Sequence, residues 1–230
     1  MKRHFFTVII LLATISFSYS QDYQIRDAMD LYRTSKVNSG DWKNTLTEND
    51  IKGSPYLNDE FINGTIYTKS KYKFVDIPLR YNIYNDQIEF KTPTNEVLAL
   101  STPEIVATVA FGDYKMVYLQ YSGTKKIRYG FFIIEEEGAA SLYSRLGVAF
   151  VAAEEPGGYK EAEPAKFVKK SDSFYIRIGL EAAKKVGSKK EVVEIFPDHH
   201  SEISTFIKKN KVKTNKPDKL KELVRYYNSL

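Results

Sequence analysis

Two neighbouring histidines, His199 and His200, are the side chains best suited to metal or acid–base chemistry, and they directly follow Asp198. An imidazole can ligate a metal or transfer a proton near neutral pH. Neighbouring side chains on a helix point about 100° apart, whereas helical metal motifs space their ligands three or four residues apart. Asp198, His199 and His200 are therefore weak metal candidates. We expect a solvated first helical turn with Asp198 as its N-cap, and no bound metal or cofactor.

Carboxylates offer a second route to catalysis. A glycosidase needs two carboxyl groups about 5–10 Å apart, one of them with a raised pKa. Acidic side chains cluster locally at residues 59–60, at Asp86 with Glu89, and at residues 135–137. Closeness along the chain does not establish that geometry, and the last cluster also fits a solvated turn after an apolar strand. A carboxylate-based hydrolase acting on polysaccharide stays open as an alternative to a protein without catalytic activity.

The most concentrated charge lies near the C-terminus, where residues 208–221 contain seven lysines and one acidic side chain. Lys208, Lys209, Lys211 and Lys213 lead this run and are the candidate contacts with an anionic surface. Each cation near an anionic lipid surface contributes roughly 1 kcal/mol, and acidic polysaccharide would attract the same charges. A plain solvated face is the simpler interpretation, since lysines are common on the wet side of amphipathic helices. No nucleic-acid partner is expected, because the run lacks stacking aromatics.

Composition excludes several classes of protein. The 230 residues contain no cysteine, which excludes disulfide-stapled miniproteins, thiol enzymes and Cys-ligated metal sites. No Gly-x-Ser-x-Gly elbow, Gly-rich phosphate loop or dinucleotide fingerprint is present. With 43% hydrophobic and 27% charged residues, the chain is expected to fold around a core as one domain, with at most a small appendage. An enzyme is the less expected outcome.

Residues 1–20 have the three-part pattern of a secretory signal peptide. A cationic start at Lys2 and Arg3 precedes thirteen mostly apolar residues, and small residues then lead to an expected cleavage after Ser20. The apolar run is shorter than the roughly 20 residues that span a bilayer. We therefore expect an exported protein, periplasmic or extracellular, with no transmembrane anchor in the mature chain. Removal of the segment lowers the formal net charge from +5 to +3.

A hydrophobic period of two runs from about residue 62 to residue 178 and predicts short antiparallel strands. It is clearest over residues 72–84, where five apolar side chains alternate with polar ones: Val75, Ile77, Leu79, Tyr81 and Ile83. Pro78 inside this run cannot donate to a ladder, so we expect a sheet edge or a bulge there. Hairpin turns are expected at three places: residues 85–86, 122–126 and 170–172. A curved sheet, a sandwich or a partly open barrel would satisfy this pattern.

The period changes near residue 188, where Ser188 and Glu191 match a capping box. Three short stretches at helical spacing follow, and their apolar faces need cover that the open face of the sheet can supply. The sequence therefore predicts an α+β fold: mainly antiparallel β over residues 61–187, then three C-terminal helices over residues 188–230 packed on the sheet in the same domain. Residues 21–60 give no clear pattern, apart from an ambiguous short helix near residues 25–32.

Several stretches resemble uncharacterised exported proteins of Bacteroidota. They are GSPYLNDEF (53–61), G-x-IY (64–67), PLRYNIYND-x-IEF (78–90), IFPD (195–198), FI (206–207) and LV-x-YYNSL (223–230). The resemblance implies a bacterial envelope location and a β region followed by helices, and it carries no assigned activity. Within it, Arg80 is expected to be a buried structural arginine that pairs with Asp59 or Glu60.

The predicted function is an exported, non-catalytic cell-envelope protein, a β-rich module that binds an unidentified envelope protein, glycan or lipid. One alternative is the carboxylate-based hydrolase, acting on envelope polysaccharide. Another is a structural protein that contacts anionic lipid through its Lys-rich C-terminal segment. The sequence does not choose the ligand, the oligomeric state or the side of the envelope.

Overall fold

The structure is a computed structural model that describes residues 51–123, 126–152 and 163–230, together with the backbone of residues 34–36. The predicted signal peptide and the ambiguous helix near residues 25–32 lie outside the described residues.

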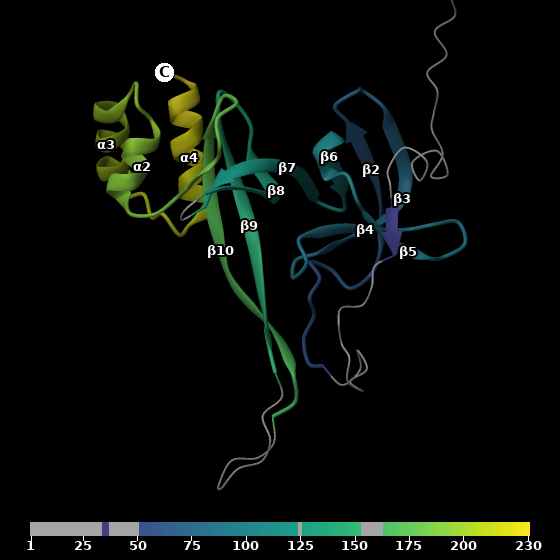
Figure 1. The fold of residues 1–230 in the computed structure, drawn as a ribbon. Coiled ribbons are helices and arrows are strands. Elements are labelled where there is room, and N and C mark those ends of the chain that lie inside the picture. The colour runs from purple at the N-terminus through teal and green to yellow at the C-terminus, as the bar shows by residue number, and fades with distance from the viewer. Residues whose placement is uncertain (1–33, 37–50, 124–125, 153–162) are drawn as a thin grey trace, which may run out of the picture.

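In the described part of the chain, eleven strands form one antiparallel sheet that curls as a half-barrel (Figure 1). Their order is β1-β5-β4-β3-β2-β6-β7-β8-β9-β10-β11, so two meanders meet where β2 pairs with β6. The strands are β1 (Thr34–Lys36), β2 (Ile62–Thr68), β3 (Lys73–Asn82), β4 (Gln87–Lys91), β5 (Val97–Leu100), β6 (Val106–Phe111), β7 (Tyr114–Ser122), β8 (Ile127–Glu136), β9 (Ala140–Val151), β10 (Lys166–Ile178) and β11 (Lys184–Lys185). Three C-terminal helices follow: α2 (Lys189–Ile195), α3 (His200–Lys209) and α4 (Pro217–Asn228). The predicted α+β fold class is confirmed.

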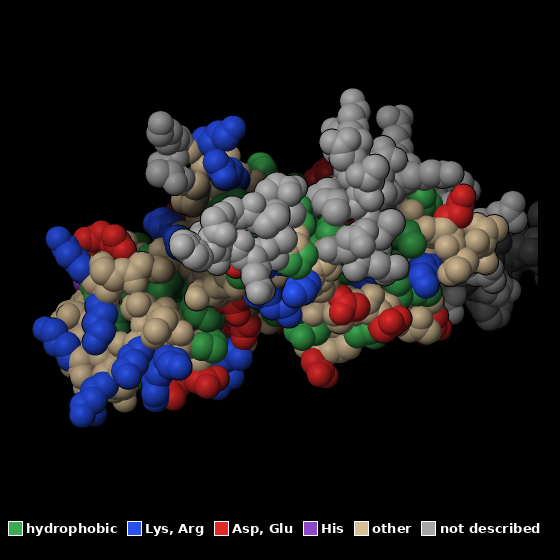
Figure 2. Space-filling view, turned by 90° about the horizontal axis from the view of Figure 1, so that it is seen from below, with side chains coloured by type: hydrophobic (Ala, Val, Ile, Leu, Met, Phe, Trp, Pro, Cys, Tyr) green, Lys and Arg blue, Asp and Glu red, His purple; other side chains and the backbone are tan. Residues whose placement is uncertain are grey.

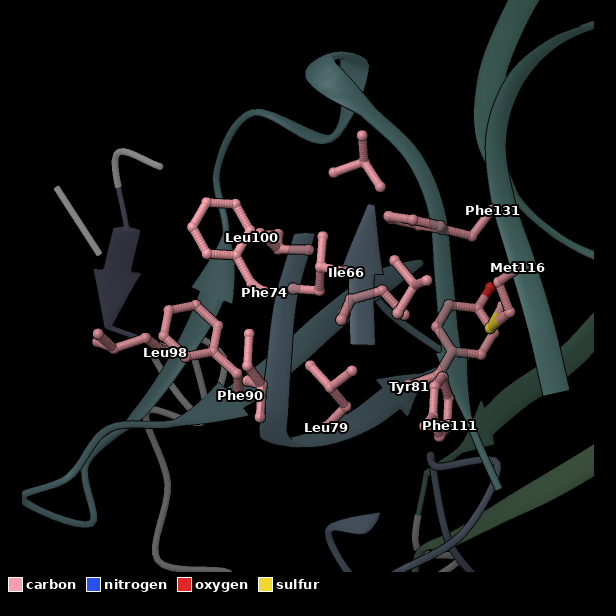
Figure 3. Packing of buried hydrophobic residues seen from close by; sticks show 14 of the residues in the cluster. Ile66, Phe74, Leu79, Tyr81, Phe90, Leu98, Leu100, Phe111, Met116 and Phe131 are labelled. Atoms are coloured by element: carbon pink, nitrogen blue, oxygen red, sulfur yellow. The ribbon is translucent and has the colours of Figure 1, made fainter. Parts of the chain in front are cut away.

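The first half of the sheet, β2 to β7, curls around a core made of its own side chains and Phe131 of β8 (Figure 3). Alternate residues of a strand face one side, which places Ile66, Leu79 and Phe111 inside at no more than 2% exposure. Leu146 and Val148 of β9 pack against the same core, although they belong to the second half of the sheet. The inside of this curl is therefore filled by the chain itself.

A bulge in β3 alters the predicted alternation. The register against β2 shifts near Asp76, whose φ is 54°, and β3 carries one extra residue there. Phe74 is consequently buried, while the predicted core residue Val75 is only half-buried. The sheet-edge alternative for Pro78 is wrong, because β3 lies between β2 and β4. Pro78 is tolerated because it lies next to the bulge and because the pairing with β4 begins only at Leu79.

The second half of the sheet rolls up around a smaller, aromatic core. Tyr121, Phe132, Tyr143 and Tyr175 come from the four strands β7 to β10 and meet edge to face, with ring centroids 5.0–6.2 Å apart. After β10 the chain returns to β7, where the amide and carbonyl of Ala183 form hydrogen bonds of 3.0 and 2.9 Å with that strand. This contact turns the last part of the sheet back on its middle.

The hairpin predicted around residues 170–172 is wrong. Residues Lys166–Ile178 form one strand, β10, which pairs with β9 on both sides of a register shift between Lys170 and Ser173. The Ser-Asp pair thus supplies a bulge within a strand instead of a turn between two strands. β9 is 12 residues long and offers partners to both halves of β10. The hairpins predicted at residues 85–86 and 122–126 are confirmed as β3–β4 and β7–β8.

The helices cover the face of β9 and β10 that points away from the aromatic core, on the left in Figure 1. Leu142 and Ile176 from the strands meet Val192, Ile203 and Leu223 from the helices, and all five side chains are fully buried. Amphipathic helices need such an apolar partner, because a helix of 7 to 12 residues is not stable alone in water. The helical cap is therefore part of the same packed body as the sheet.

Two local contacts fix the helices at their ends. The predicted capping box at the start of α2 is confirmed, with Ser188 and Glu191 each accepting the other's backbone amide. At the end of α4, the Asn228 side chain donates to the carbonyl of Ala140 at 2.9 Å and accepts from its amide at 2.8 Å. That bracket joins the last helix to the start of β9.

Candidate functional site

The four lysines selected from the sequence lie together at the end of α3 and in the turn after it, and all are exposed: Lys208, Lys209, Lys211 and Lys213. Lys189 and Lys190, in the first turn of α2, are exposed as well. Within the described residues none of these six lysines forms an ion pair. We call the six lysines the basic face. Figure 2 shows Lys and Arg side chains gathered at the helical end of the molecule, on the left of that view.

Backbone geometry directs two of these lysines outward. The amide of Val212 donates to the carbonyl of Ile207 at 3.1 Å, and the amide of Lys211 donates to Lys208 at 3.3 Å, which are the two bonds of a Schellman motif. Val212 and Ile207 are buried in the helical core, so Lys211 and Lys213 on either side of Val212 face solvent. Lys211 has a φ of 49°, the left-handed conformation that helix ends usually give to glycine.

The later lysines of the same run have different roles. Lys219 pairs with Glu222 on the same helix, and Lys221 of α4 reaches Glu135 of β8, both at 2.7 Å. Those two lysines neutralise acidic neighbours, whereas the six lysines of the basic face, like Lys216, have no ion pair among the described residues. The tertiary structure thus pairs the last two lysines of the run and leaves the earlier ones without an ionic partner in the described part of the chain.

A hollow of about 400 Å³ lies between α2 and α3, next to the basic face. His200, Ser204 and Lys208 follow one another at intervals of four along α3 and so lie on one side of that helix. Lys189 and Lys190 border the hollow from α2. The other lining residues are Val193, Glu194 and Ile207. Three lysines and one glutamate therefore border a hollow whose lining surface is mostly apolar.

The weak metal candidates do not assemble into a site. The prediction that Asp198 is the N-cap of α3 is wrong. His199 occupies that position, without a side-chain hydrogen bond to the helix. His199 instead lies 3.8 Å from Glu202 and edge-on to the Tyr227 ring. His200 borders the hollow described above. In the described part of the chain, no group of three or more His, Asp or Glu side chains is close enough to hold a metal ion.

The acidic cluster at residues 135–137 is fully paired with cations. Glu135 meets Lys221, Glu136 meets Arg225, and Glu137 meets Lys115, each at 2.7 Å. Two of these pairs join β8 to α4, so the cluster anchors the last helix on the sheet instead of forming a free turn. Glu135 also accepts a 2.7 Å hydrogen bond from Ser144.

One carboxyl group near this cluster has a perturbed pKa. Burial, and then the charge of Glu135, raise the pKa of Asp172 in the β10 bulge. A raised carboxyl pKa is one requirement of a glycosidase acid. A surface hollow of about 310 Å³ is lined by the three glutamates of residues 135–137 together with Lys115 and Ile134. Asp172 does not border that hollow. Within the described residues, the carboxyl group with the raised pKa and the acidic hollow are thus separate features.

Asp86 joins the two halves of the sheet. It lies in the β3–β4 turn and accepts hydrogen bonds from the Tyr81 hydroxyl at 2.8 Å and the Phe131 amide at 3.1 Å. It also pairs with Arg145 of β9 at 2.8 Å. Burial, followed by the charge of Asp86, raises the pKa of Tyr81 far above its ordinary value. Gly130 leaves room for this contact, because a Cβ there would lie 2.6 Å from the Asp86 carboxylate.

Arg80 forms an ion pair with Glu89, and not with Asp59 or Glu60 as predicted. The Arg80 guanidinium forms two hydrogen bonds of 2.7 and 3.2 Å with the fully buried carboxylate of Glu89 on the neighbouring strand. Its contact with Asp59 is to the backbone carbonyl, at 3.1 Å. Tyr56 stacks on the same guanidinium, 3.5 Å from the ring centre. Arg80 is therefore a structural residue, as predicted, that clamps residues 56–59 onto β3.

Sequence reasoning missed the part that α2 contributes to the basic face. Lys189 and Lys190 were visible as neighbours of the capping box, but only the contact between α2 and α3 brings them beside Lys208. Comparison of the chain with protein-family models, curated proteins and solved structures gives no match. Within the described residues, no helix is both long and apolar enough to cross a bilayer.

Proposed function

We propose that this chain is an exported, non-catalytic protein of the bacterial envelope, in which the curled sheet is a scaffold and the helical cap binds an anionic lipid surface through its basic face. One observation carries the proposal. Six exposed lysines on α2, α3 and the following turn have no ionic partner among the described residues. Lys219 and Lys221 of the same segment, in contrast, are paired with Glu222 and Glu135.

The position of Lys211 adds support. A non-glycine residue in the left-handed region costs roughly 1 kcal/mol or more, and glycine would avoid that cost. A charged side chain held in a strained backbone conformation is a reason to look for a function of that side chain. In the proposal, the attraction between the Lys211 ammonium and an anionic lipid surface offsets the cost of the left-handed backbone conformation.

Binding inside the sheet has less support. The concave side of β2–β7 is filled by the first core, and the rolled second half is filled by aromatic rings. The two hollows noted on the described surface lie beside the helices and beside the Glu135 cluster, outside both cores. A ligand- or partner-binding function is therefore assigned to the helical cap.

The test is co-sedimentation of the purified protein with phosphatidylcholine vesicles, with and without phosphatidylglycerol. We expect binding only to the anionic vesicles, and loss of binding as ionic strength rises from about 0.05 M to about 0.5 M, because salt screens surface attraction. Replacing Lys208, Lys209, Lys211 and Lys213 with Gln should weaken binding by roughly two to three orders of magnitude at low salt.

The control replaces Lys219 and Lys221 with Gln, which removes two charges instead of four; these lysines belong to the same run but are paired with Glu222 and Glu135. This variant should bind nearly as well as the unchanged protein. The proposal fails if binding ignores salt, or if the double variant loses half or more of the binding free energy that the fourfold variant loses, because the effect would then follow net charge instead of the exposed face.

A further inference from the structure

We propose that the hollow between α2 and α3 is a subsite for a phosphomonoester group carried by a lipid headgroup. This inference rests on the proposed function and adds selectivity to it: the basic face supplies general attraction to an anionic surface, and the hollow recognises one chemical group on that surface.

The charges that border the hollow suit a dianion. Lys189 and Lys190 approach it from α2 and Lys208 from α3, while Glu194 is the single lining carboxylate. The sum of these charges is about two positive units at neutral pH. A phosphomonoester carries a charge of about −1.5 to −2 at that pH and has three acceptor oxygens. A phosphodiester carries only one negative charge and matches this set less well.

Two further residues that carry hydrogen-bond donors border the same hollow. His200 and Ser204 lie on the side of α3 that also carries Lys208, because the three residues are spaced by four. A serine hydroxyl and an imidazole N–H can each donate a hydrogen bond to a phosphate oxygen. The hollow thus offers point charges from lysine and directed donors from α3, which is a combination that an array of surface lysines lacks.

Size and floor indicate a headgroup instead of a bare ion. A hollow of about 400 Å³ lies within the range of small-molecule sites and is larger than a phosphate ion needs. Val193 and Ile207 supply apolar surface at its base. The carbon skeleton of a glycerol or a sugar can lie against that surface while its phosphate faces the lysines. Three lysines of the basic face border the hollow, so binding of that face to a lipid surface would bring the hollow close to the headgroups.

The experiment compares vesicles of phosphatidylcholine that contain either phosphatidic acid, a phosphomonoester, or phosphatidylglycerol, a phosphodiester. The two preparations are adjusted to equal surface potential. We expect the unchanged protein to bind the phosphatidic acid vesicles about tenfold more tightly. The Lys190→Gln/Lys208→Gln variant should lose this preference, and both positions are exposed, so the fold is retained.

The matched control is Lys211→Gln/Lys213→Gln, which removes the same charge away from the hollow. It should weaken binding to both vesicles by a similar factor and keep the tenfold ratio. Equal binding to the two vesicles by the unchanged protein, or a preference that survives in the Lys190→Gln/Lys208→Gln variant, would overturn the subsite alone. Absence of binding to either vesicle would overturn the proposed function, and the subsite with it.

An experiment with a soluble phosphomonoester distinguishes a lipid headgroup from a free phosphate ester as the ligand of the hollow. Glycerol 3-phosphate should weaken binding to phosphatidic acid vesicles to the level of phosphatidylglycerol vesicles and leave binding to the latter nearly unchanged, which supports recognition of the phosphate group in the hollow. Tight calorimetric binding of glycerol 3-phosphate without any preference between vesicles would assign the hollow to a free phosphate ester and overturn the lipid headgroup.

Discussion

A few buried or half-buried polar side chains connect separate parts of the described sheet. The Arg80–Glu89 pair clamps the segment before β2 onto β3, and Asp86 connects the β3–β4 turn to β8 and β9. Each carboxylate has several donors: Glu89 accepts from Arg80 and Asn82, and Asp86 accepts from three groups. Such groups are costly to bury alone, so removal of one member leaves the others unsatisfied.

Replacing Arg80 with Met should destabilise the protein by roughly 3–5 kcal/mol, because it leaves the Glu89 carboxylate buried without its cation. The double variant Arg80→Met/Glu89→Leu should recover much of this loss, since both charges are then gone. Urea unfolding of the single and double variants measures the difference. A double variant less stable than the single one would contradict this account of the pair.

The free energy of unfolding should fall above about pH 10 through the buried tyrosines. Burial raises the pKa of Tyr81 above its ordinary value of 10.0, and the same cause raises the pKa of Tyr118 and Tyr175. A pKa raised by folding means that the folded state keeps the proton, so the stabilisation is complete below the unfolded value and is lost as pH rises beyond it.

Tyr81→Phe should show a smaller loss of stability between about pH 9 and pH 11 than the unchanged protein, because one titrating group is removed. At neutral pH it should be less stable by about 1 kcal/mol, from the lost hydrogen bond to Asp86. Denaturant unfolding at several pH values gives both quantities. Parallel pH curves for the two proteins would show that Tyr81 does not contribute.

At the scale of elements, the helical cap depends on a few contacts between α4 and the strands. Asn228 brackets the backbone of Ala140, which is fully buried, while Arg225 meets Glu136 at the surface. The first contact satisfies two buried backbone groups, and the second is exposed to screening by water. The Asn228–Ala140 hydrogen bonds should therefore contribute more to the free energy of unfolding than the Arg225–Glu136 ion pair.

Asn228→Ala should lower the free energy of unfolding by about 2 kcal/mol, since it leaves the amide and the carbonyl of Ala140 without their partners. Arg225→Gln is the comparison variant and should have little effect, because the Arg225 side chain is largely exposed. Thermal or urea unfolding distinguishes the two. Similar losses in both variants would mean that the bracket is no stronger than a surface ion pair.

The end of α3 offers a test in which stability and binding move in opposite directions. Lys211→Gly should stabilise the protein by roughly 0.5–1 kcal/mol, because glycine adopts a φ of 49° without strain, although it also gains freedom in the unfolded chain. The same change should weaken binding to anionic vesicles, as Lys213→Gln should, but Lys213→Gln should leave stability unchanged. A destabilised Lys211→Gly variant would show that the lysine is held there by packing.

At the scale of the whole molecule, the proposal requires export. The segment of residues 1–20 should be removed, so N-terminal sequencing of the protein from the envelope fraction of its host should begin at Gln21. Deleting residues 2–20 should leave the protein in the cytoplasm. Recovery of an uncleaved chain from the cytoplasm would contradict the export proposal.

The local patterns of the sequence were sufficient for the fold class. Alternation of apolar residues over a hundred positions, the capping box at Ser188 and the helical spacing after it each depend on neighbours within a few residues. The same local logic failed at Val75 and at residues 170–172. There, a bulge in β3 and the long partner strand β9 decided the geometry, and a bulge depends on the register between strands.

The candidate site was only half visible in the sequence. Lys208, Lys209, Lys211 and Lys213 were identified by their density along the chain, since charge near charge is a local property. Whether each lysine is free or paired depends on distant residues: Glu135 neutralises Lys221 from β8. Sequence alone therefore determined the composition, the α+β class and the succession of a β region and helices along the chain. Tertiary packing chose which charges stay unpaired and made the hollow between α2 and α3, because both depend on side chains far apart in the chain.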